Sequence, residues 1–139
     1  MATGTNDPNG RRYHTAQVHY LRKRITYAIE NTEIIVGYLP ANASVIGGGV
    51  HVITGFDDSG TDTLDVGFKD GSSTDDPNGY ATLLAIDAVG FIALDELAAT
   101  TNIQQTNGCT VTCIYNGQNN NAAAGVADVI VTYVVDNDE

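Results

Sequence analysis

The stretch that decides the fold is Val126-Ala-Asp-Val-Ile-Val-Thr-Tyr-Val-Val135, near the end of the chain. Successive side chains of a β-strand point to opposite faces of the sheet, so residues two apart share a face. One alternating set of this stretch is wholly apolar: Ala127, Val129, Val131, Tyr133 and Val135. The other set includes Asp128 and Thr132. We therefore expect a strand whose apolar set faces a core and whose Asp128 set faces outward.

Short β-rich runs of the same kind, separated by turn residues, occur along most of the chain. The further runs that we expect to form strands are residues 14–21, 25–29, 33–39, 43–56, 61–68, 90–94 and 109–115. In 61–68 the inward residues are expected to be Leu64, Val66 and Phe68. Residues 22–24 suggest a basic turn, and residues 81–87 a short helical or irregular piece. The pattern predicts an all-β protein, an antiparallel β-sandwich or jelly roll of about eight strands with an extended N-terminal arm.

Three consecutive glycines, Gly47 to Gly49, interrupt the longest of these runs. Glycine inside a strand marks a bulge, a bend, or a place where another backbone approaches closely. Of these three interpretations we favour a simple bend.

The composition describes a globular domain. The 139 residues are enough to bury a core without a disulfide or metal, and 42% are hydrophobic, too many for a disordered chain. No run approaches the ~18 apolar residues of a membrane span, and the polar first ten residues lack the apolar centre of a signal peptide. We expect no membrane partner and synthesis in the cytoplasm.

Charge is divided unevenly along the chain, whose net charge is −11. Five of the six basic residues lie in residues 1–24, a basic N-terminal arm and first strand: Arg11, Arg12, Arg22, Lys23 and Arg24. Residues 25–139, the expected body, carry sixteen acids against Lys69 alone. An acidic body repels phosphate, which argues against nucleic acid as the partner. The arm is a candidate for docking on an acidic protein, or is merely a solvated tail.

The two cysteines, Cys109 and Cys113, lie in an alternating run that predicts a strand. Four residues of strand separate their α-carbons by about 13 Å, whereas a disulfide needs less than about 7 Å. We expect two free thiols on one face of the sheet, both buried.

No residue pattern indicates catalysis. His14, His19 and His51 have no metal-binding spacing, and no nucleophile, phosphate-loop or dinucleotide motif is present. We therefore expect no enzyme activity and no cofactor.

The acidic loops are the remaining candidates for chemistry. Weak calcium candidates cluster in one hairpin: Asp57, Asp58, Asp62 and Asp65. Their spacing does not match the Asp-x-Asp-x-Asp-Gly calcium loop, and aspartate is also a common turn residue.

Five segments carry a resemblance to a known class of proteins. They are Gly37-Tyr-Leu-Pro-Ala-Asn-Ala-Ser-Val-Ile46, Val50-His-Val-Ile-Thr-Gly-Phe56, Thr61-Asp-Thr-Leu-Asp-Val-Gly67, Asp76-Pro-Asn-Gly-Tyr-Ala81 and Gly125-Val-Ala-Asp-Val-Ile-Val-Thr-Tyr133. Together they resemble small virion structural proteins of tailed bacteriophages, of the capsid decoration (cement) type. The resemblance covers most of residues 33–135 and consists of strand and turn patterns.

The resemblance implies a jelly-roll virion protein that binds the outer capsid surface and stabilises capsomer junctions. Its implied partner is the major capsid protein, its implied assembly a homotrimer, and its implied location the virion surface. A phage tail, neck or head-fibre protein is the first alternative. A carbohydrate-binding module or a hydrolase is the second.

Overall fold

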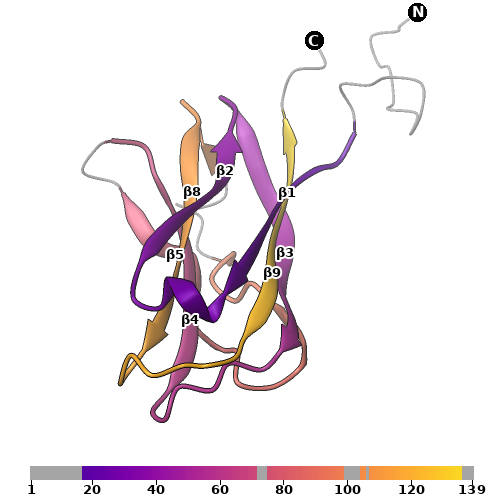
Figure 1. Ribbon diagram of the computed structural model, residues 1–139. Coiled ribbons are helices and arrows are strands. Elements are labelled where there is room, and N and C mark those ends of the chain that lie inside the picture. The colour runs from indigo at the N-terminus through magenta and orange to yellow at the C-terminus, as the bar shows by residue number, and fades with distance from the viewer. Residues whose placement is uncertain (1–16, 72–74, 99–103, 106, 136–139) are drawn as a thin grey trace, which may run out of the picture.

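The computed structural model describes residues 17–71, 75–98, 104–105 and 107–135. Its elements are β1 (His19–Thr26), the 3-10 turn η2 (Tyr27–Ile29), β2 (Glu33–Leu39), β3 (Ala43–Thr54), β4 (Asp62–Lys69), β5 (Asp76–Ala85), β6 (Gly90–Ala93), β7 (Gln104–Gln105), β8 (Cys109–Gly117) and β9 (Val126–Val135). Figure 1 shows them stacked in two layers. The predicted all-β sandwich is confirmed.

The two sheets have the strand order of a jelly roll. One is β1-β9-β3-β6, with β7 paired to β3, and the other is β2-β8-β4-β5. All the pairings are antiparallel. With the two-residue β7 set aside, the chain alternates between the sheets at every step except from β4 to β5. This is the double-sheet arrangement in which eight strands form two Greek keys.

The core lies between the sheets and follows the predicted alternation. In β4 the predicted inward residues Leu64, Val66 and Phe68 are all buried. In β9 the residues Ala127, Val129 and Val131 are fully buried, and the last two members of the apolar set are half-buried. Burial of this apolar area, at about 25 cal/mol per Å², is the main stabilising contribution to the fold.

The predicted basic turn at residues 22–24 is wrong, because β1 runs straight through it. Arg22 lies opposite Ile130 and Arg24 opposite Asp128 in an unbroken ladder with β9. Charged residues are tolerated there because β1 is an edge strand, open to solvent on one side. The boundary that we placed between residues 1–24 and the body of the protein, residues 25–139, therefore falls inside β1.

The predicted strand at residues 25–29 ends early. Only Ile25 and Thr26 belong to β1, and Tyr27–Ile29 form the 3-10 turn that carries the chain to the other sheet. The N–H of Tyr27 donates to the carbonyl of Gly125, which fixes the turn against the start of β9.

Of the two alternatives predicted for residues 81–87, the helical piece is wrong, since β5 continues to Ala85, and the irregular piece is confirmed. The pairing of β4 with β5 shifts register twice, and Leu83 has a positive φ of 52°. These bulges break the regular alternation, which is why the apolar spacing looked partly helical. They leave Leu84 buried and Leu83 exposed.

Two carboxylates, those of Asp65 on β4 and of Asp95 after β6, accept backbone N–H groups of β5 at this irregular point. Asp65 accepts the N–H of Leu83 at 2.7 Å, and Asp95 accepts the N–H of Thr82 at 3.1 Å. Two donors of an edge strand are thus paired within the chain.

The triple glycine forms a bulge with close backbone approach, and the simple bend that we favoured is wrong. The register between β3 and β9 shifts between Val45 and Gly47. Gly48 has a φ of 125°, and a side chain there would collide with the carbonyl of Ile130. Only glycine combines this conformation with this proximity.

The two cysteines are free and buried in β8, as predicted. Both belong to the inward-facing set of that strand, with Val111 between them. Burial raises the pKa of the Cys109 thiol to about 11 and that of Cys113 to about 12. These thiols act as small core residues.

Candidate interaction surface

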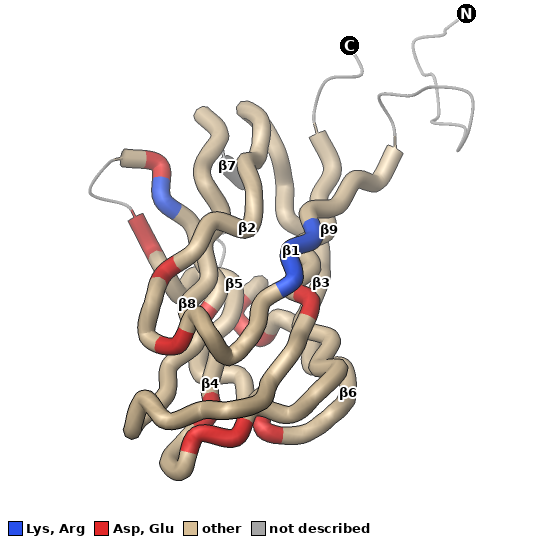
Figure 2. The backbone as a smooth tube through the Cα atoms, viewed as in Figure 1, with Lys and Arg blue, Asp and Glu red and all other residues tan. Residues whose placement is uncertain are grey.

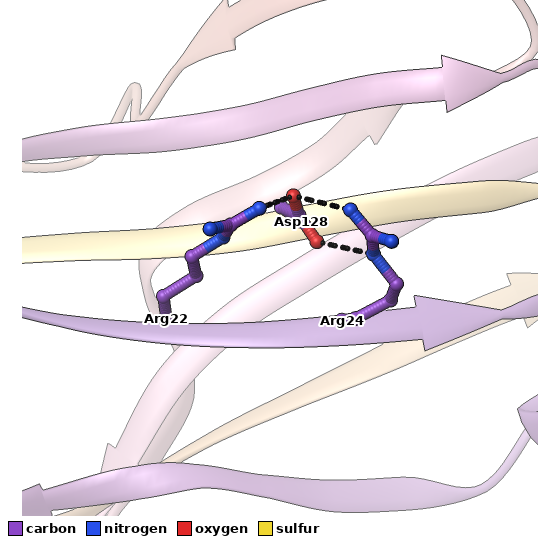
Figure 3. A network of polar contacts seen from close by, with 3 residues as sticks. All are labelled: Arg22, Arg24 and Asp128. Carbon is purple, nitrogen blue, oxygen red and sulfur yellow. Dashed lines mark hydrogen bonds and ion pairs between the residues drawn. The ribbon is translucent and has the colours of Figure 1, made fainter.

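Two arginines of β1 hold a buried carboxylate of β9 on the outer side of the first sheet (Figure 3). Arg24 donates from Nε to Oδ1 of Asp128 at 2.9 Å and from Nη2 to Oδ2 at 3.1 Å. Arg22 donates from Nη2 to Oδ2. Residues 22 and 24 share a face of β1, and the ladder places that face beside Asp128. The strand pairing therefore builds the cluster.

Burial is unequal within this cluster. The side chain of Asp128 is 3% exposed, whereas those of Arg22 and Arg24 are 55% and 56% exposed. The sequence placed Asp128 on the outward set, and the two arginines cover it there. An unpaired carboxylate at this depth would be costly, so its burial depends on the arginines.

Electrostatics favour the charged forms of Asp128 and Arg24. The hydrogen bond from Arg24 lowers the pKa of Asp128 most, burial opposes this, and Arg22 adds to the lowering, which brings the pKa to about 2. The same hydrogen bond raises the pKa of Arg24 above its usual value. The cluster therefore has one net positive charge over the ordinary pH range.

Apolar and aromatic side chains surround this charge. A hollow of about 460 Å³ lies beside Arg22, and its lining residues are Val18, His19, Tyr20, Arg22, His51, Asp128, Ile130 and Thr132. Val18 and Tyr20 are among the most exposed large apolar side chains of the described residues. We call the surface formed by Val18, Tyr20, Arg22, Arg24, Asp128 and Ile130 the Arg22 face.

The Arg22 face is the one net-positive patch within the described ranges. The basic residues of the described ranges are Arg22, Lys23 and Arg24 on β1 and Lys69 on β4. Figure 2 shows the basic colour on β1 and acidic segments on other parts of the backbone. Lys69 forms an ion pair with Glu33 at 2.5 Å, which cancels its charge locally. Arg22, Lys23 and Arg24, against Asp128 alone, leave β1 and its neighbour positive.

The predicted arm residues are only partly described. Arg22, Lys23 and Arg24 lie in β1, where the first and third hold Asp128 and the second is exposed. Arg11, Arg12 and His14 lie outside the described residues. His19 stacks on Tyr133, with ring centroids 5.6 Å apart, and His51 lines the hollow.

The four calcium candidates are all engaged as acceptors of protein donors. Asp58 accepts four backbone N–H groups, from Gly60, Gln118, Asn119 and Asn121. Asp57 accepts those of Ala123 and Ala124. Asp62 accepts the N–H of Asp58 and the hydroxyl of Tyr115. Asp65 accepts the N–H of Leu83 and the amide of Asn116.

This acidic hairpin fastens two loops together. The β3–β4 loop holds the β8–β9 loop through Asp57 and Asp58, and the partners lie about sixty residues apart in sequence. Burial raises the pKa of Asp58, but the backbone donors outweigh it and lower the pKa to about 2. No group of three or more His, Cys, Asp or Glu side chains converges in metal-binding geometry within the described ranges.

Sequence reasoning had not singled out Asp128 or Tyr20 as residues of a candidate site. The sequence shows Asp128 as the acid of an otherwise largely apolar strand, but its arginine partners lie about a hundred residues away in sequence.

No helix in the described part of the chain has the length and apolarity needed to cross a membrane.

The fold and this surface define a single jelly roll with a cationic, partly apolar outer face. Three solved structures of phage capsids contain a chain with a similar fold. A chain in the structure described as the capsid of Ralstonia phage GP4 superposes with a TM-score of 0.65, at 20% identity, over 94% of this chain and 90% of that one. A chain in the cyanophage Pam1 capsid asymmetric unit gives 0.62, at 20% identity, over 97% of both chains.

A third similar chain comes from the acidic stable capsid structure of Helicobacter pylori bacteriophage KHP30. It gives a TM-score of 0.55 at 18% identity, over 86% of this chain and 89% of that one. No protein-family model and no curated protein matches this sequence. At these identities the likeness establishes the shared fold.

Proposed function

We propose that this protein is a virion structural protein of a bacteriophage, and specifically a decoration protein on the outer capsid surface. The observation that carries the proposal is the end-to-end likeness to chains from three phage capsid structures. The match with the cyanophage chain covers 97% of each partner, so the likeness is not confined to one element of the fold.

The physical properties of the chain support a role in adhesion. A protein that holds neighbouring capsomers together needs contact area and rigidity, and many identical copies multiply weak contacts. The two packed sheets supply the rigidity, and the Arg22 face supplies an exposed surface on β1 and β9. The partner that we propose is the major capsid protein, with a homotrimer as the assembled form and no enzymatic activity.

The test is to find and count the protein in purified particles of the phage that encodes it. Quantitative mass spectrometry should give a copy number that scales with the number of capsomers, and cryo-electron microscopy should show density outside the shell. A few copies at the neck or tail would favour the alternative of a tail, neck or fibre protein. Absence from the particle would refute both.

The contribution of the N-terminal arm needs a deletion that respects the strand. Removal of residues 1–24 would destroy most of β1, whereas removal of residues 1–16 leaves β1 and its pairing with β9 whole. We expect the protein without residues 1–16 to fold and to bind capsid shells more weakly. Unchanged binding would show that Arg11 and Arg12 contribute nothing to docking.

A further inference from the structure

We infer that the Arg22 face is a docking site for a carboxylate-bearing surface of a different protein, with Asp128 holding the two guanidinium groups in position. This deepens the proposed function, on which it rests for the identity of the partner. The partner side chain is an aspartate or glutamate, and an apolar side chain beside it fills the hollow.

The guanidinium groups have donors to spare. Each has five N–H groups, and the bonds to Asp128 use one from Arg22 and two from Arg24. Both side chains are more than half exposed, so the remaining donors are open to a partner. A guanidinium group forms two parallel hydrogen bonds with a carboxylate in one plane. An arginine therefore binds a carboxylate in preference to a neutral amide.

Asp128 lowers the entropic cost of such a contact. A free arginine on a surface samples many rotamers, and fixing it on binding is unfavourable. Here the buried carboxylate fixes both arginines before any partner arrives, at 2.9 and 3.1 Å from Arg24. It neutralises only one of the two positive charges, so one remains for the partner.

The hollow supplies the second half of the contact. At about 460 Å³ it has room for an apolar side chain beside Arg22, against Tyr20 and Ile130. Charged groups at the rim and aromatic or aliphatic groups at the centre are typical of protein–protein contacts. A small inorganic anion would leave these apolar groups exposed to water.

The charge of the chain decides between the possible partners. A net charge of −11 repels nucleic acid at long range, so one positive patch is a poor site for a polyanion. The homotrimer that we propose is expected to form through other surfaces, because two copies that met at this face would bring their positive charges together. A different protein that presents a local carboxylate is therefore the occupant best matched to this face.

The first test uses a simple probe. The ¹⁵N-labelled protein is titrated with the blocked dipeptide N-acetyl-leucyl-glutamyl amide and with its neutral glutaminyl analogue. We expect shifts of the amides of residues 20–24 and 128–132 with the glutamyl probe, and about tenfold weaker binding of the analogue. Equal binding of the two probes, or shifts confined to another surface, would overturn the inference.

The second test uses capsid shells that lack the protein. Arg22→Gln removes one open guanidinium and leaves Arg24 in place on Asp128, so the fold should persist. Lys69→Gln is the matched control, because it removes one positive charge from the other sheet. We expect about tenfold weaker shell binding for Arg22→Gln and little change for Lys69→Gln. If both variants bind like the natural protein, the inference fails while the proposed function stands.

Two further outcomes separate the hypotheses. If the natural protein ignores the shells but binds the glutamyl probe on the Arg22 face, the proposed function fails and the docking site stands. If light scattering detects self-association, and the amide shifts on dilution map to residues 20–24, a second copy occupies the face and the inference is overturned. The probe titration needs no variant, so misfolding of Arg22→Gln would not leave the question open.

Discussion

Arg24 and Asp128 lie directly opposite each other in the ladder between β1 and β9, and one guanidinium contacts both carboxylate oxygens. The contact joins an edge strand to the strand beside it in the sheet, next to Arg22 on the same face. The pair therefore serves two purposes. It allows an acid to be buried on the outer side of a sheet, and it presents ordered positive charge to solvent.

Replacement of Arg24 by glutamine should weaken the fold. It leaves Asp128 buried with only the single bond from Arg22, and an under-compensated buried charge is strongly unfavourable. We expect the melting temperature at pH 7 to fall by about 5 °C or more. Lys23→Gln, on the same strand but exposed, is the control and should melt like the natural protein. Equal melting of the two variants would contradict the structural role of the pair.

Acidification should destabilise the protein through Asp128 and Asp58. Both have a pKa of about 2 in the folded state, below the value of about 4 in an unfolded chain. Their stabilising contributions are complete above pH 4 and are lost as the pH falls towards 2. The melting temperature should drop over that interval, and less steeply in Asp128→Asn. A variant curve parallel to the natural one would show that Asp128 does not contribute.

Glu30 should behave in the opposite sense. Burial raises its pKa most, the N–H of Ala122 lowers it, and nearby Asp58 raises it further. Its Oε1 is buried without a hydrogen-bond partner among the described residues. A raised folded pKa means that the contribution of Glu30 to stability is present below its unfolded pKa and is lost as the pH rises through the folded pKa.

Glu30→Gln should therefore raise the melting temperature at pH 7, by about 2 °C, and have little effect at pH 4. Glu33→Gln is the matched control, since Glu33 is an exposed acid paired with Lys69. That variant should give no gain at either pH. A loss of stability in Glu30→Gln at pH 7 would mean that the ionised carboxylate is favourable where it lies.

The assignment of the inward and outward faces of β9 can be tested by introducing an aspartate at either of two adjacent positions. Val129 is fully buried between the sheets, and Val129→Asp should prevent folding, because an unpaired buried carboxylate costs several kcal/mol (about 3 or more). Ile130→Asp lies on the outer face and should fold. Circular dichroism and gel filtration distinguish the outcomes. A soluble, normally melting Val129→Asp protein would show that the inward face is misassigned.

The triple glycine offers a similarly matched pair. Gly48→Ala forces a side chain against the carbonyl of Ile130 at a positive φ, and should cost about 2 kcal/mol or more in the free energy of unfolding. Gly47→Ala meets nothing within 4 Å and has no positive φ, so it should be tolerated. Chemical denaturation measures both. Equal stability of the two variants would argue against a close approach of the β3 and β9 backbones at Gly48.

Strong alternation made the central strands predictable. The stretches of β4, β8 and β9 have buried apolar sets at every second position, and the sequence located their inward faces correctly. Alternation failed where the backbone departs from regular geometry. The positive φ of Leu83 and the bulge before Gly47 change the face of the residues that follow, and no local pattern reports this.

The candidate site was hidden for a different reason. Arg24 and Asp128 are 104 residues apart, and only the pairing of β1 with β9 brings them together. In the sequence the three basic residues at 22–24 suggested a turn, and Asp128 was expected only to face away from the core. The acids of the β3–β4 hairpin suggested a metal site. Their carboxylates instead accept backbone N–H groups from a loop about sixty residues further on, and no local pattern reveals these partners.

The two carboxylates that accept backbone N–H groups of β5 bear on whether copies of this protein associate at high concentration. A bare strand edge invites pairing with any other bare edge, and copies at high concentration polymerise through it. Asp95 accepts the N–H of Thr82, and the bulge at Leu83, whose N–H is accepted by Asp65 of β4, disturbs the flat edge that another strand would need. We expect these features to disfavour strand-to-strand pairing along β5 between crowded copies, so that contacts between side chains determine which partner binds.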